Sequence, residues 1–253
     1  MKPMTFQPVQ SPPAPRPGEA GRRDVKTRLA AAFRLLAQHD LGIGVAGHMS
    51  ARDPERPDCF WVNPFGAAYR TMQADQLSLV RHDGVLVEGA PINAAAFAIH
   101  GEVHRARRDV NCVVHGHPVH GTAWAALGRA LDPINQDVCA FYEDHVVFGE
   151  ATGLVVDTSE GARIAAALGS AKAAILRSHG LLTVGLTIDA ALWWFVLMER
   201  CCRIQLLAES AGTPAQIPAE QARSIARQIG TPEFGWFQCQ PLLAPILSGS
   251  DLP

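Results

Sequence analysis

Hydrophobic residues recur at helical spacing in several parts of the chain. Asp24 is of the residue type that caps helix N-termini, and the apolar positions that follow it are Val25, Leu29, Phe33 and Leu36. This pattern predicts a helix over residues 24–39. The same spacing predicts further helices over residues 94–107, 119–127, 159–168, 189–210 and 219–229. The helix at 189–210 is apolar on most sides, so we expect it to be buried.

Short apolar runs between these helices predict strands. Turn signals such as Asn63-Pro64 and Asp83-Gly84 separate them. The predicted strands cover residues 48–52, 60–62, 77–80, 84–89, 111–117, 145–149 and 153–157, and two more lie within 173–185. Strands and helices alternate without an internal repeat, which predicts an α/β or α+β fold.

The two ends of the chain differ from its centre. Residues 1–22 contain six prolines, which neither donate ladder hydrogen bonds nor continue a helix, so we predict a flexible arm. Residues 23–253 then form one domain, because no internal linker divides them. The domain closes with the helix at 219–229 and an aromatic tail at 233–243. This tail could cover a neighbouring subunit's site or strap its own core, and we favour the strap.

Composition excludes several classes of function. The chain is 48% hydrophobic and has a formal charge of -2, so it can bury a core and carries no basic footprint for nucleic acid or anionic membranes. No apolar run reaches the ~18–20 residues of a spanning helix, and the N-terminus lacks a signal pattern. We therefore expect a cytoplasmic protein. Its six cysteines form no C-x-x-C pair and are expected to be reduced and mostly buried.

Histidines supply the strongest chemical signal. His115 and His117 stand two residues apart on a predicted strand, so their side chains point to the same face. His179 lies at a break between two strands and is the best third ligand for a metal ion. Spacing alone leaves ordinary surface or core histidines as an even alternative. His100 and His104 share one helix face, where helix packing is a sufficient explanation for one of them.

At this point the chain resembles the class II aldolase/adducin family from about residue 24 to residue 210. The resemblance is carried by the segments GVAGHMSAR, WVNPFG, IHGEVHRARRDVNCVVHGHPVHG and ILRSHGLLTVG. It implies a three-layer α/β/α fold around a mostly antiparallel central sheet. It also implies a homotetramer with active sites near the subunit interfaces. The metal ligands of the family fall on His115, His117 and His179, which implies one divalent ion (Zn, Mn, Fe or Co) per subunit.

The resemblance also shows where the chain departs from sugar-phosphate aldolases. Ala96 stands where those enzymes carry an acid/base glutamate, and Ala94 and Ala95 stand where serines hold the substrate phosphate. The position of the protonating tyrosine falls near Gln136. Cleavage of a simple sugar phosphate is therefore disfavoured, and the adducin-like branch of the family fits better.

The resemblance further suggests which residues line the pocket. The pocket residues implied are Gly44, His48, Asn63, Gly66 and His100. For Asn63 and Gly66 a plain turn is an equal alternative. Catalytic candidates are Tyr142 and His145, with Gln136 by position, although FYEDH could equally be a polar loop entering a strand.

Three functions remain open from the sequence. The first is a divalent-metal-dependent carbon–carbon lyase, a decarboxylase or aldolase acting on an unphosphorylated aromatic or 2-oxo/hydroxy acid. The second is a non-haem Fe(II) oxygenase acting on an aromatic 2-oxo acid, although iron usually takes two histidines and a carboxylate. The third is a non-catalytic assembly module like an adducin head. We predict the first of these functions, the carbon–carbon lyase. Either enzyme would act on a small-molecule substrate.

Overall fold

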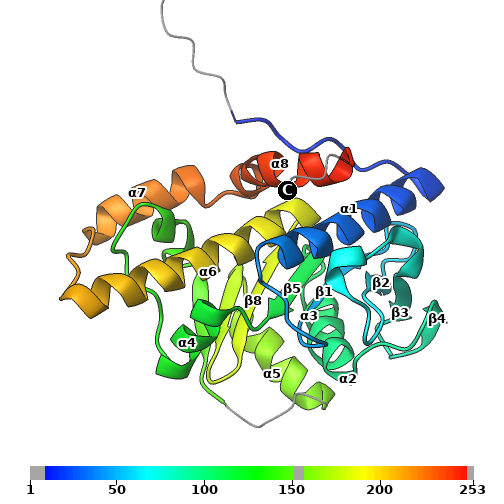
Figure 1. Cartoon of the computed structure of the whole chain (residues 1–253), viewed down its shortest axis with the longest axis horizontal. Coiled ribbons are helices and arrows are strands. Elements are labelled where there is room, and N and C mark those ends of the chain that lie inside the picture. Colours follow the sequence, from blue (N-terminus) through cyan, green and yellow to red (C-terminus); the bar gives the residue numbers. More distant parts are fainter. Residues whose placement is uncertain (1–8, 151–156, 250–253) are drawn as a thin grey trace, which may run out of the picture.

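An eight-stranded sheet forms the centre of the molecule. The computed structural model describes residues 9–150 and 157–249, and its strands lie in the order β4-β3-β2-β1-β5-β8-β7-β6. Each neighbouring pair is antiparallel except β6 and β7, which are parallel. Helices cover both faces (Figure 1). The three-layer α/β/α fold with a mostly antiparallel sheet is thereby confirmed.

The strands are short, three to six residues each. They are β1 His48–Arg52, β2 Cys59–Val62, β3 Ser78–Arg81, β4 Leu86–Glu88, β5 Cys112–Gly116, β6 His145–Phe148, β7 Ala173–Leu176 and β8 Gly180–Gly185. The strand predicted over residues 84–89 is shorter in the structure, where β4 covers only Leu86–Glu88. Most of the one predicted at 153–157 lies outside the described residues.

The helices and short helical turns fill the remaining chain. The α-helices are α1 Gly18–Gln38, α2 Ala94–Ala96, α3 Glu102–Ala106, α4 Val119–Leu127, α5 Thr158–Leu168, α6 Ile188–Ala211, α7 Ala219–Ile229 and α8 Pro232–Leu247. The 3₁₀ turns are η1 Tyr69–Thr71, η2 Ala74–Gln76 and η4 Asp137–Phe141, and η3 Phe97–Gly101 is a π-helical turn. The helix predicted over 94–107 is thus one helical run interrupted by η3.

Alternating residues of β5 pack into two separate cores on opposite faces of the sheet. Val114 on β5 joins a core with Phe33 of α1 and Phe195 of α6. Its neighbour Val113 faces the other way, into a core with Ile164 of α5. Since strand side chains alternate between faces, His115 shares the face of Val113, and His48 lies beside it in register on β1. The histidines therefore sit on the face that η3, α3 and α5 cover.

The first helix begins earlier than the sequence predicts. Helix α1 begins at Gly18 rather than Asp24, so the arm predicted over 1–22 is wrong for its last five residues. Pro17 supplies the extended residue before the helix, and a proline there loses no intrahelical hydrogen bond. Asp24 lies inside α1, where its carboxylate pairs with Arg16.

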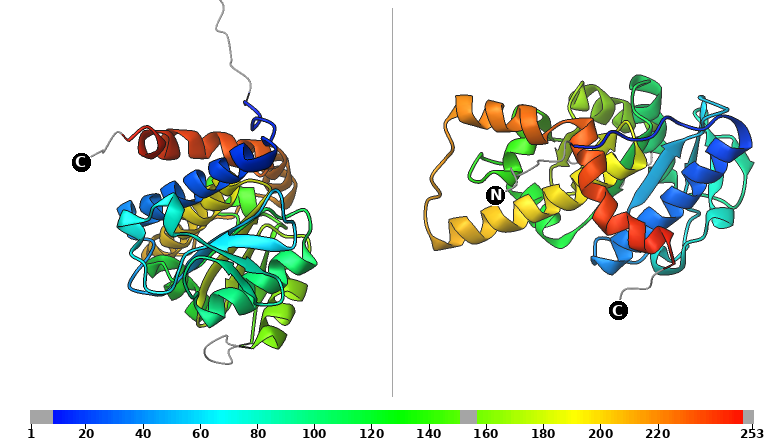
Figure 2. Two further views of the ribbon diagram at one scale, coloured as in Figure 1. Left: turned by 90° about the vertical axis from the view of Figure 1, so that its right-hand side faces the viewer. Right: turned by 90° about the horizontal axis from the view of Figure 1, so that it is seen from above.

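The predicted aromatic tail is the helix α8, which begins after Thr231 and contains Trp236. Thr231 caps it by accepting a hydrogen bond from the backbone N–H of Phe234. The helix lies across α1 and α6 (Figure 2), and Trp236 is 8% exposed. Within the chain the segment covers the protein's own core, as the favoured interpretation predicted.

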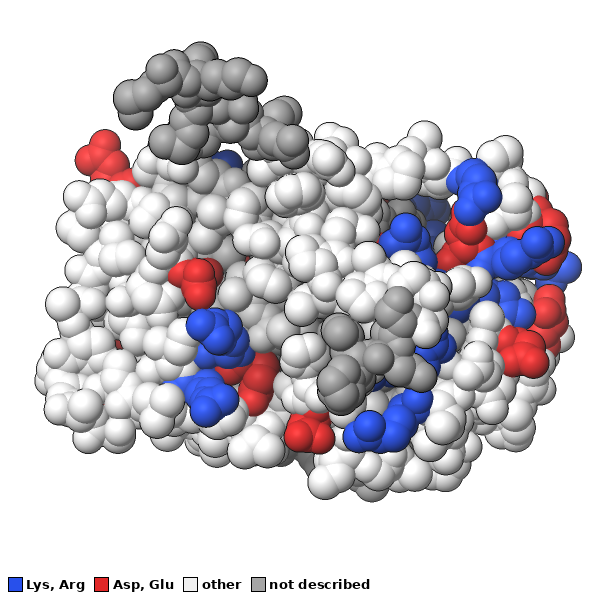
Figure 3. All heavy atoms as spheres, turned by 45° about the horizontal axis from the view of Figure 1, so that its top comes forward, with Lys and Arg blue, Asp and Glu red and all other residues white. Residues whose placement is uncertain are grey.

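No helix among the described residues is long and apolar enough to cross a membrane. On the face shown in Figure 3, cationic and anionic side chains lie next to one another rather than in separate patches. All six cysteines are buried and unpaired. Surface charge therefore offers no extended basic patch on that face.

The close crossing of α5 and η3 gives a first prediction. A Cβ added at Gly161 would lie 1.8 Å from the carbonyl oxygen of Ala98, a backbone atom that cannot move aside. Gly161→Ala is expected to lower the free energy of unfolding by about 1–3 kcal/mol, measured by urea denaturation. Gly149→Ala is the control, because nothing lies within 4 Å of its added Cβ. Equal stability of both variants would contradict the crossing.

Candidate metal centre

Three histidines meet at one end of the sheet. The side-chain nitrogens of His115, His117 and His179 that could bind a metal all lie within 4.8 Å of one another. A metal–imidazole bond is about 2.0–2.1 Å long, so small side-chain rotations would bring all three onto one ion. The structure thus brings together the three residues predicted as metal ligands.

The local backbone explains how the third histidine reaches the other two. His179 lies in the tight turn between β7 and β8, where Ser178 has φ of 57°, in the left-handed region. Gly180, which follows His179, must be small. A Cβ at this position would come within 2.4 Å of the Gly116 carbonyl oxygen and 2.9 Å of the His117 ring. Glycine at this position therefore lets β8 approach β5 at the point where the histidines converge.

The imidazoles are in the chemical state that a metal ion requires. His115 Nδ1–H donates a hydrogen bond to the carbonyl oxygen of Leu181 at 2.9 Å, which leaves the Nε2 lone pair free. His117 Nε2 is buried without a partner among the described residues. Burial, aided by His117, lowers the pKa of His179 to about 4, and burial lowers the pKa of His117 as well. Three neutral nitrogen donors fit a divalent ion.

Two predicted pocket residues lie beside this cluster. The ring centroid of His48 is 5.9 Å from that of His115, and that of His100 is 5.7 Å from that of His48. His48 is 4% exposed and neither of its ring nitrogens has a partner among the described residues. Burial and then the nearby His117 and His179 lower the pKa of His48 to about 4. These uncharged imidazoles extend the polar surface of the metal cluster.

The other predicted pocket residues are not tied to the histidines by any described contact. Gly44 is exposed in the turn between α1 and β1, where its φ of 58° suits glycine. Gly66 has φ of 83° in an exposed turn after β2. Asn63 is 6% exposed, and its side-chain oxygen has no partner among the described residues. Their role in substrate binding stays a prediction.

The predicted acid–base residues lie away from the histidines within one chain. His145 begins β6 and pairs with Ala173 at the start of β7. His179 follows the other end of β7. The two histidines are therefore separated by about four residues, or ~13 Å, along the strand direction. Both nitrogens of His145 are occupied: Nδ1–H donates to the Phe141 carbonyl at 2.7 Å, and Nε2 accepts from the Leu131 N–H at 3.0 Å. His145 therefore ties loop segments together in the single chain.

Tyr142 and Gln136 flank η4 in the same region. The Arg223 guanidinium lies over the Tyr142 ring, 5.8 Å from its centroid. Gln136 is exposed and precedes η4. Neither has a described contact with the metal cluster, so a catalytic role for either stays a prediction.

Three buried residues with structural hydrogen bonds were not singled out from the sequence: Glu199, Asp53 and Ser50. Glu199 on α6 accepts hydrogen bonds from His120 Nδ1 at 2.7 Å and from the backbone N–H of His120 at 3.0 Å, and so fixes the start of α4 just after His117. Asp53 anchors α1. Ser50 links His100 to His104. Ser50 could have been identified from the sequence, because it lies two residues after His48 on the predicted strand and so shares its face.

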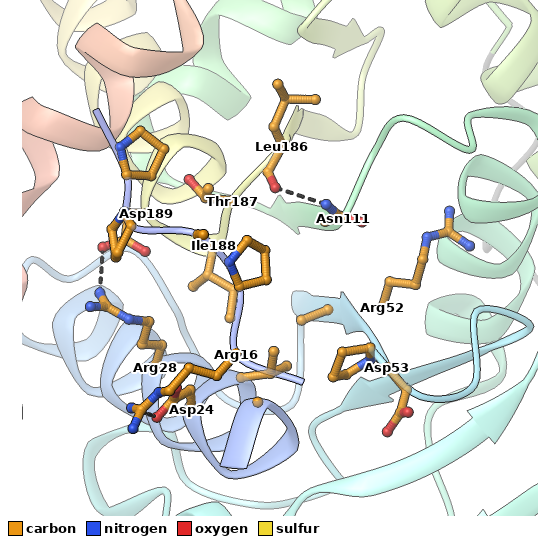
Figure 4. A pocket seen from close by; sticks show the side chains of 18 of the residues that line it. Arg16, Asp24, Arg28, Arg52, Asp53, Asn111, Leu186, Thr187, Ile188 and Asp189 are labelled. Atoms are coloured by element: carbon orange, nitrogen blue, oxygen red, sulfur yellow. Dashed lines mark hydrogen bonds and ion pairs between the residues drawn. The ribbon is translucent and has the colours of Figure 1, made fainter. Parts of the chain in front are cut away.

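A separate cavity of about 650 Å³ lies at the opposite end of β1. It is enclosed by the proline segment before α1, by Ala51 and Asn111, and by the start of α6 (Figure 4). Its lining includes the 2.7 Å ion pair between Arg28 and Asp189, and Arg52, whose guanidinium donates to backbone carbonyls such as that of His104 at 2.7 Å. None of the three metal-cluster histidines lines it, so the chemistry of the histidines is independent of this cavity.

Comparison with known proteins places these features in a family. Residues 27–206 match the family described as Class II Aldolase and Adducin N-terminal domain. Decarboxylase NovR from Streptomyces niveus is 47% identical over 226 residues, covering 87% of this chain and 83% of that protein. A 4-hydroxy-3-prenylphenylpyruvate oxygenase/4-hydroxy-3-prenylbenzoate synthase from Streptomyces roseochromogenus subsp. oscitans is 46% identical over 228 residues, covering 87% and 81%.

A solved structure agrees with the sequence relatives. The L-fuculose 1-phosphate aldolase from Glaciozyma antarctica PI12 superposes with a TM-score of 0.85 at 40% identity, covering 97% of this chain and 93% of that one. All three of these similar proteins share with this chain more than four-fifths of their length and carry enzyme names. The chain is an enzyme and belongs to the class II aldolase/adducin family.

Proposed function

We propose that His115, His117 and His179 hold one divalent metal ion, and that the chain cleaves a carbon–carbon bond of an unphosphorylated aromatic 2-oxo or hydroxy acid. The observation that carries this proposal is the convergence of three neutral imidazoles whose ligand nitrogens lie within 4.8 Å of one another. The bound ion would act as a Lewis acid that stabilises the enolate or phenolate left by bond cleavage. Zinc, manganese, iron and cobalt all suit three imidazoles.

The absence of an acid/base carboxylate at Ala96 supports the choice of substrate. Ala96 is fully buried in an apolar cluster with Phe60, Val62 and Val80, so this position offers neither a proton nor a grip on phosphate. Ala95 uses its backbone N–H to bond the Asn93 side chain that caps α2. Of the two Streptomyces relatives, one is named a decarboxylase, and the name of the other, a phenylpyruvate oxygenase and benzoate synthase, points toward aromatic acids.

The chain's own residues would then position the acid. His48 lies next to the metal histidine His115, and neither of its ring nitrogens has a partner among the described residues; His100 lies next to His48. Protonation of the product needs a further group, and none of Tyr142, His145 and Gln136 has a described contact with the metal histidines within one chain. We infer that the enzyme works as a homo-oligomer, a tetramer by analogy with its family, in which a neighbouring copy completes the site.

Exposed apolar side chains near the histidines support that assembly. Ile43 is 76% exposed in the loop before His48, and Val119 is 72% exposed two residues after His117. Phe65, in the turn after β2, is 58% exposed. Large exposed apolar side chains are typical of surfaces that bind another protein.

Iron-dependent oxygenation is the second candidate, favoured by the printed name of the relative from Streptomyces roseochromogenus. The non-catalytic adducin-head module is disfavoured, since two similar proteins carry enzyme names. The proposed partners are the substrate and further copies of the chain. The proposed location is the cytoplasm.

One experiment separates the two enzyme candidates. The protein is purified without oxygen, its metal content is measured, and carbon dioxide release and oxygen uptake are followed with 4-hydroxyphenylpyruvate and 4-hydroxymandelate. We expect about one metal ion per chain and carbon dioxide release without oxygen uptake. Stoichiometric iron with substrate-dependent oxygen uptake would establish the oxygenase instead. Failure to bind any metal under any loading condition would exclude both.

A further inference from the structure

A buried carboxylate holds the start of the helix that follows the metal-binding strand. Glu199 of α6 is 9% exposed, and its Oε1 accepts hydrogen bonds from the backbone N–H of His120 at 3.0 Å and from His120 Nδ1–H at 2.7 Å. Its Oε2 accepts from the backbone N–H of Gly121 at 2.5 Å. Both backbone N–H groups belong to the first turn of α4, where a helix offers them no internal acceptor. One side chain of α6 therefore fixes where α4 begins.

His117 is joined to this anchor by a short, stiff link. Strand β5 ends one residue before His117, so this histidine stands outside the strand. Pro118 follows, and its ring restricts both its own backbone and that of the residue before it. The Thr122 N–H bonds to the Pro118 carbonyl at 2.8 Å and closes the first turn of α4. A shift of that turn would move His117, because only two residues separate it from the first N–H that Glu199 holds.

The other two metal histidines are tied to the same region through Leu181. The Leu181 carbonyl accepts the 2.9 Å hydrogen bond from His115 Nδ1–H, and His179 lies two residues before Leu181. The Leu181 side chain packs against the start of α4. A Cβ added at Gly121 would come within 2.4 Å of Leu181 Cδ1 and within 3.1 Å of Glu199 Oε2. Glycine at 121 thus lets α4, β8 and the carboxylate pack together beside the segments that carry the three histidines.

We propose that Glu199 is a positioning residue for the metal centre, and that it acts on the placement of His117 through the start of α4. The inference rests on the proposed function, because it concerns the ion that the three histidines would hold. Hydrogen-bonding groups that orient metal ligands typically change metal affinity by about 10- to 100-fold. Glu199 would act by a longer route, since it bonds the backbone next to a ligand rather than the ligand's ring. The anchor supplies, on the far side of His117, the constraint that a continuing strand would otherwise give.

The zinc affinity of the metal-free full chain tests this role without substrate. Wild type and Glu199→Gln are titrated with zinc in competition with a chromophoric chelator. The amide of glutamine has one acceptor atom, so its NH₂ group would face one of the two backbone N–H groups. We expect Glu199→Gln to bind zinc about 10-fold more weakly than wild type. Equal zinc affinity of the folded variant would overturn the proposal.

Replacing His120 separates the backbone route from a direct role of its imidazole. His120→Ala loses the bond from Nδ1–H but keeps both backbone N–H groups on Glu199. Its zinc affinity is therefore expected to stay close to that of wild type. A loss as large as that in Glu199→Gln would refute the proposal, because the effect would then run through the His120 side chain.

Asp53→Ala is the matched control for lost stability. Asp53 is another buried carboxylate that accepts from two backbone N–H groups, but it lies beyond the end of β1 opposite to His48. This variant should be less stable and keep its zinc affinity. A similar fall in zinc affinity in Asp53→Ala and Glu199→Gln would mean that general loosening of the fold weakens the metal site, and the positioning role would be rejected.

A second variant keeps the test decisive if Glu199→Gln does not fold. Glu199→Asp retains the charge, but a carboxylate shorter by one methylene cannot keep all three hydrogen bonds, so weaker zinc binding is expected here too. The two proposals fail in different ways. If wild-type protein binds no zinc, the proposed function is wrong and the positioning role falls with it. If wild-type protein binds zinc and the folded Glu199 variants bind it equally well, only the positioning role is wrong.

Discussion

Replacing His179 with alanine is expected to weaken binding of a divalent ion by at least about a hundredfold. Loss of groups that merely orient metal ligands costs about 10–100-fold in affinity, so loss of a ligand itself should exceed that range. The imidazole is half-buried in the turn before β8, so its removal leaves no large cavity in the core. The folded protein should therefore remain, and the metal dissociation constant can be measured by competition with a chromophoric chelator.

The comparison variants sharpen this experiment. His115→Ala should have the same effect on the dissociation constant, whereas His39→Ala should have none, since His39 is an exposed residue at the end of α1. Circular dichroism and gel filtration of each variant check that the fold and assembly survive. Full metal occupancy in either His179→Ala or His115→Ala would show that the cluster is not the metal site.

The metal ligands could be predicted because their positions follow from local rules. Residues two apart on a strand share a face, which joins His115 to His117 without knowledge of the fold. His179 needed more, since only the pairing of β5 with β8 brings it to the same end of the sheet. The family resemblance supplied that pairing. The structure adds the cause, which is the glycine at 180 that allows the close approach.

The acid–base residues could not be predicted in the same way. His145 has an ordinary histidine pattern in the sequence, and only the fold shows that its two nitrogens bond the backbone at Phe141 and Leu131. Non-local contacts of this kind are set by tertiary packing rather than by spacing. The predicted helix start at Asp24 was wrong for a similar reason. Asp24 is of a residue type that suits an N-cap, but the helix begins earlier, directly after Pro17.

Removal of the Asp53 carboxylate should have the largest effect on stability. Asp53 is 0% exposed and accepts hydrogen bonds from Arg22 Nε at 2.8 Å and from Trp61 Nε1 at 2.8 Å. It also accepts from the backbone N–H groups of Glu55 at 2.9 Å and Arg56 at 2.8 Å. Asp53→Ala leaves a partly buried cation and three further donors without this fully buried acceptor, so we expect a loss of about 3–5 kcal/mol in the free energy of unfolding.

Urea denaturation of the metal-free protein measures that loss, with Asp58→Ala as the control. Asp58 is exposed, and its replacement should change stability by no more than about 0.5 kcal/mol. Asp53 follows the end of β1 opposite to His48, about five residues or ~16 Å of strand from the metal cluster. Zinc affinity of the folded Asp53→Ala protein should therefore stay close to that of wild type. A large fall in zinc affinity with little change in stability would mean that this end of β1 is coupled to the histidines, and that the site is not built independently of the helix α1 anchor.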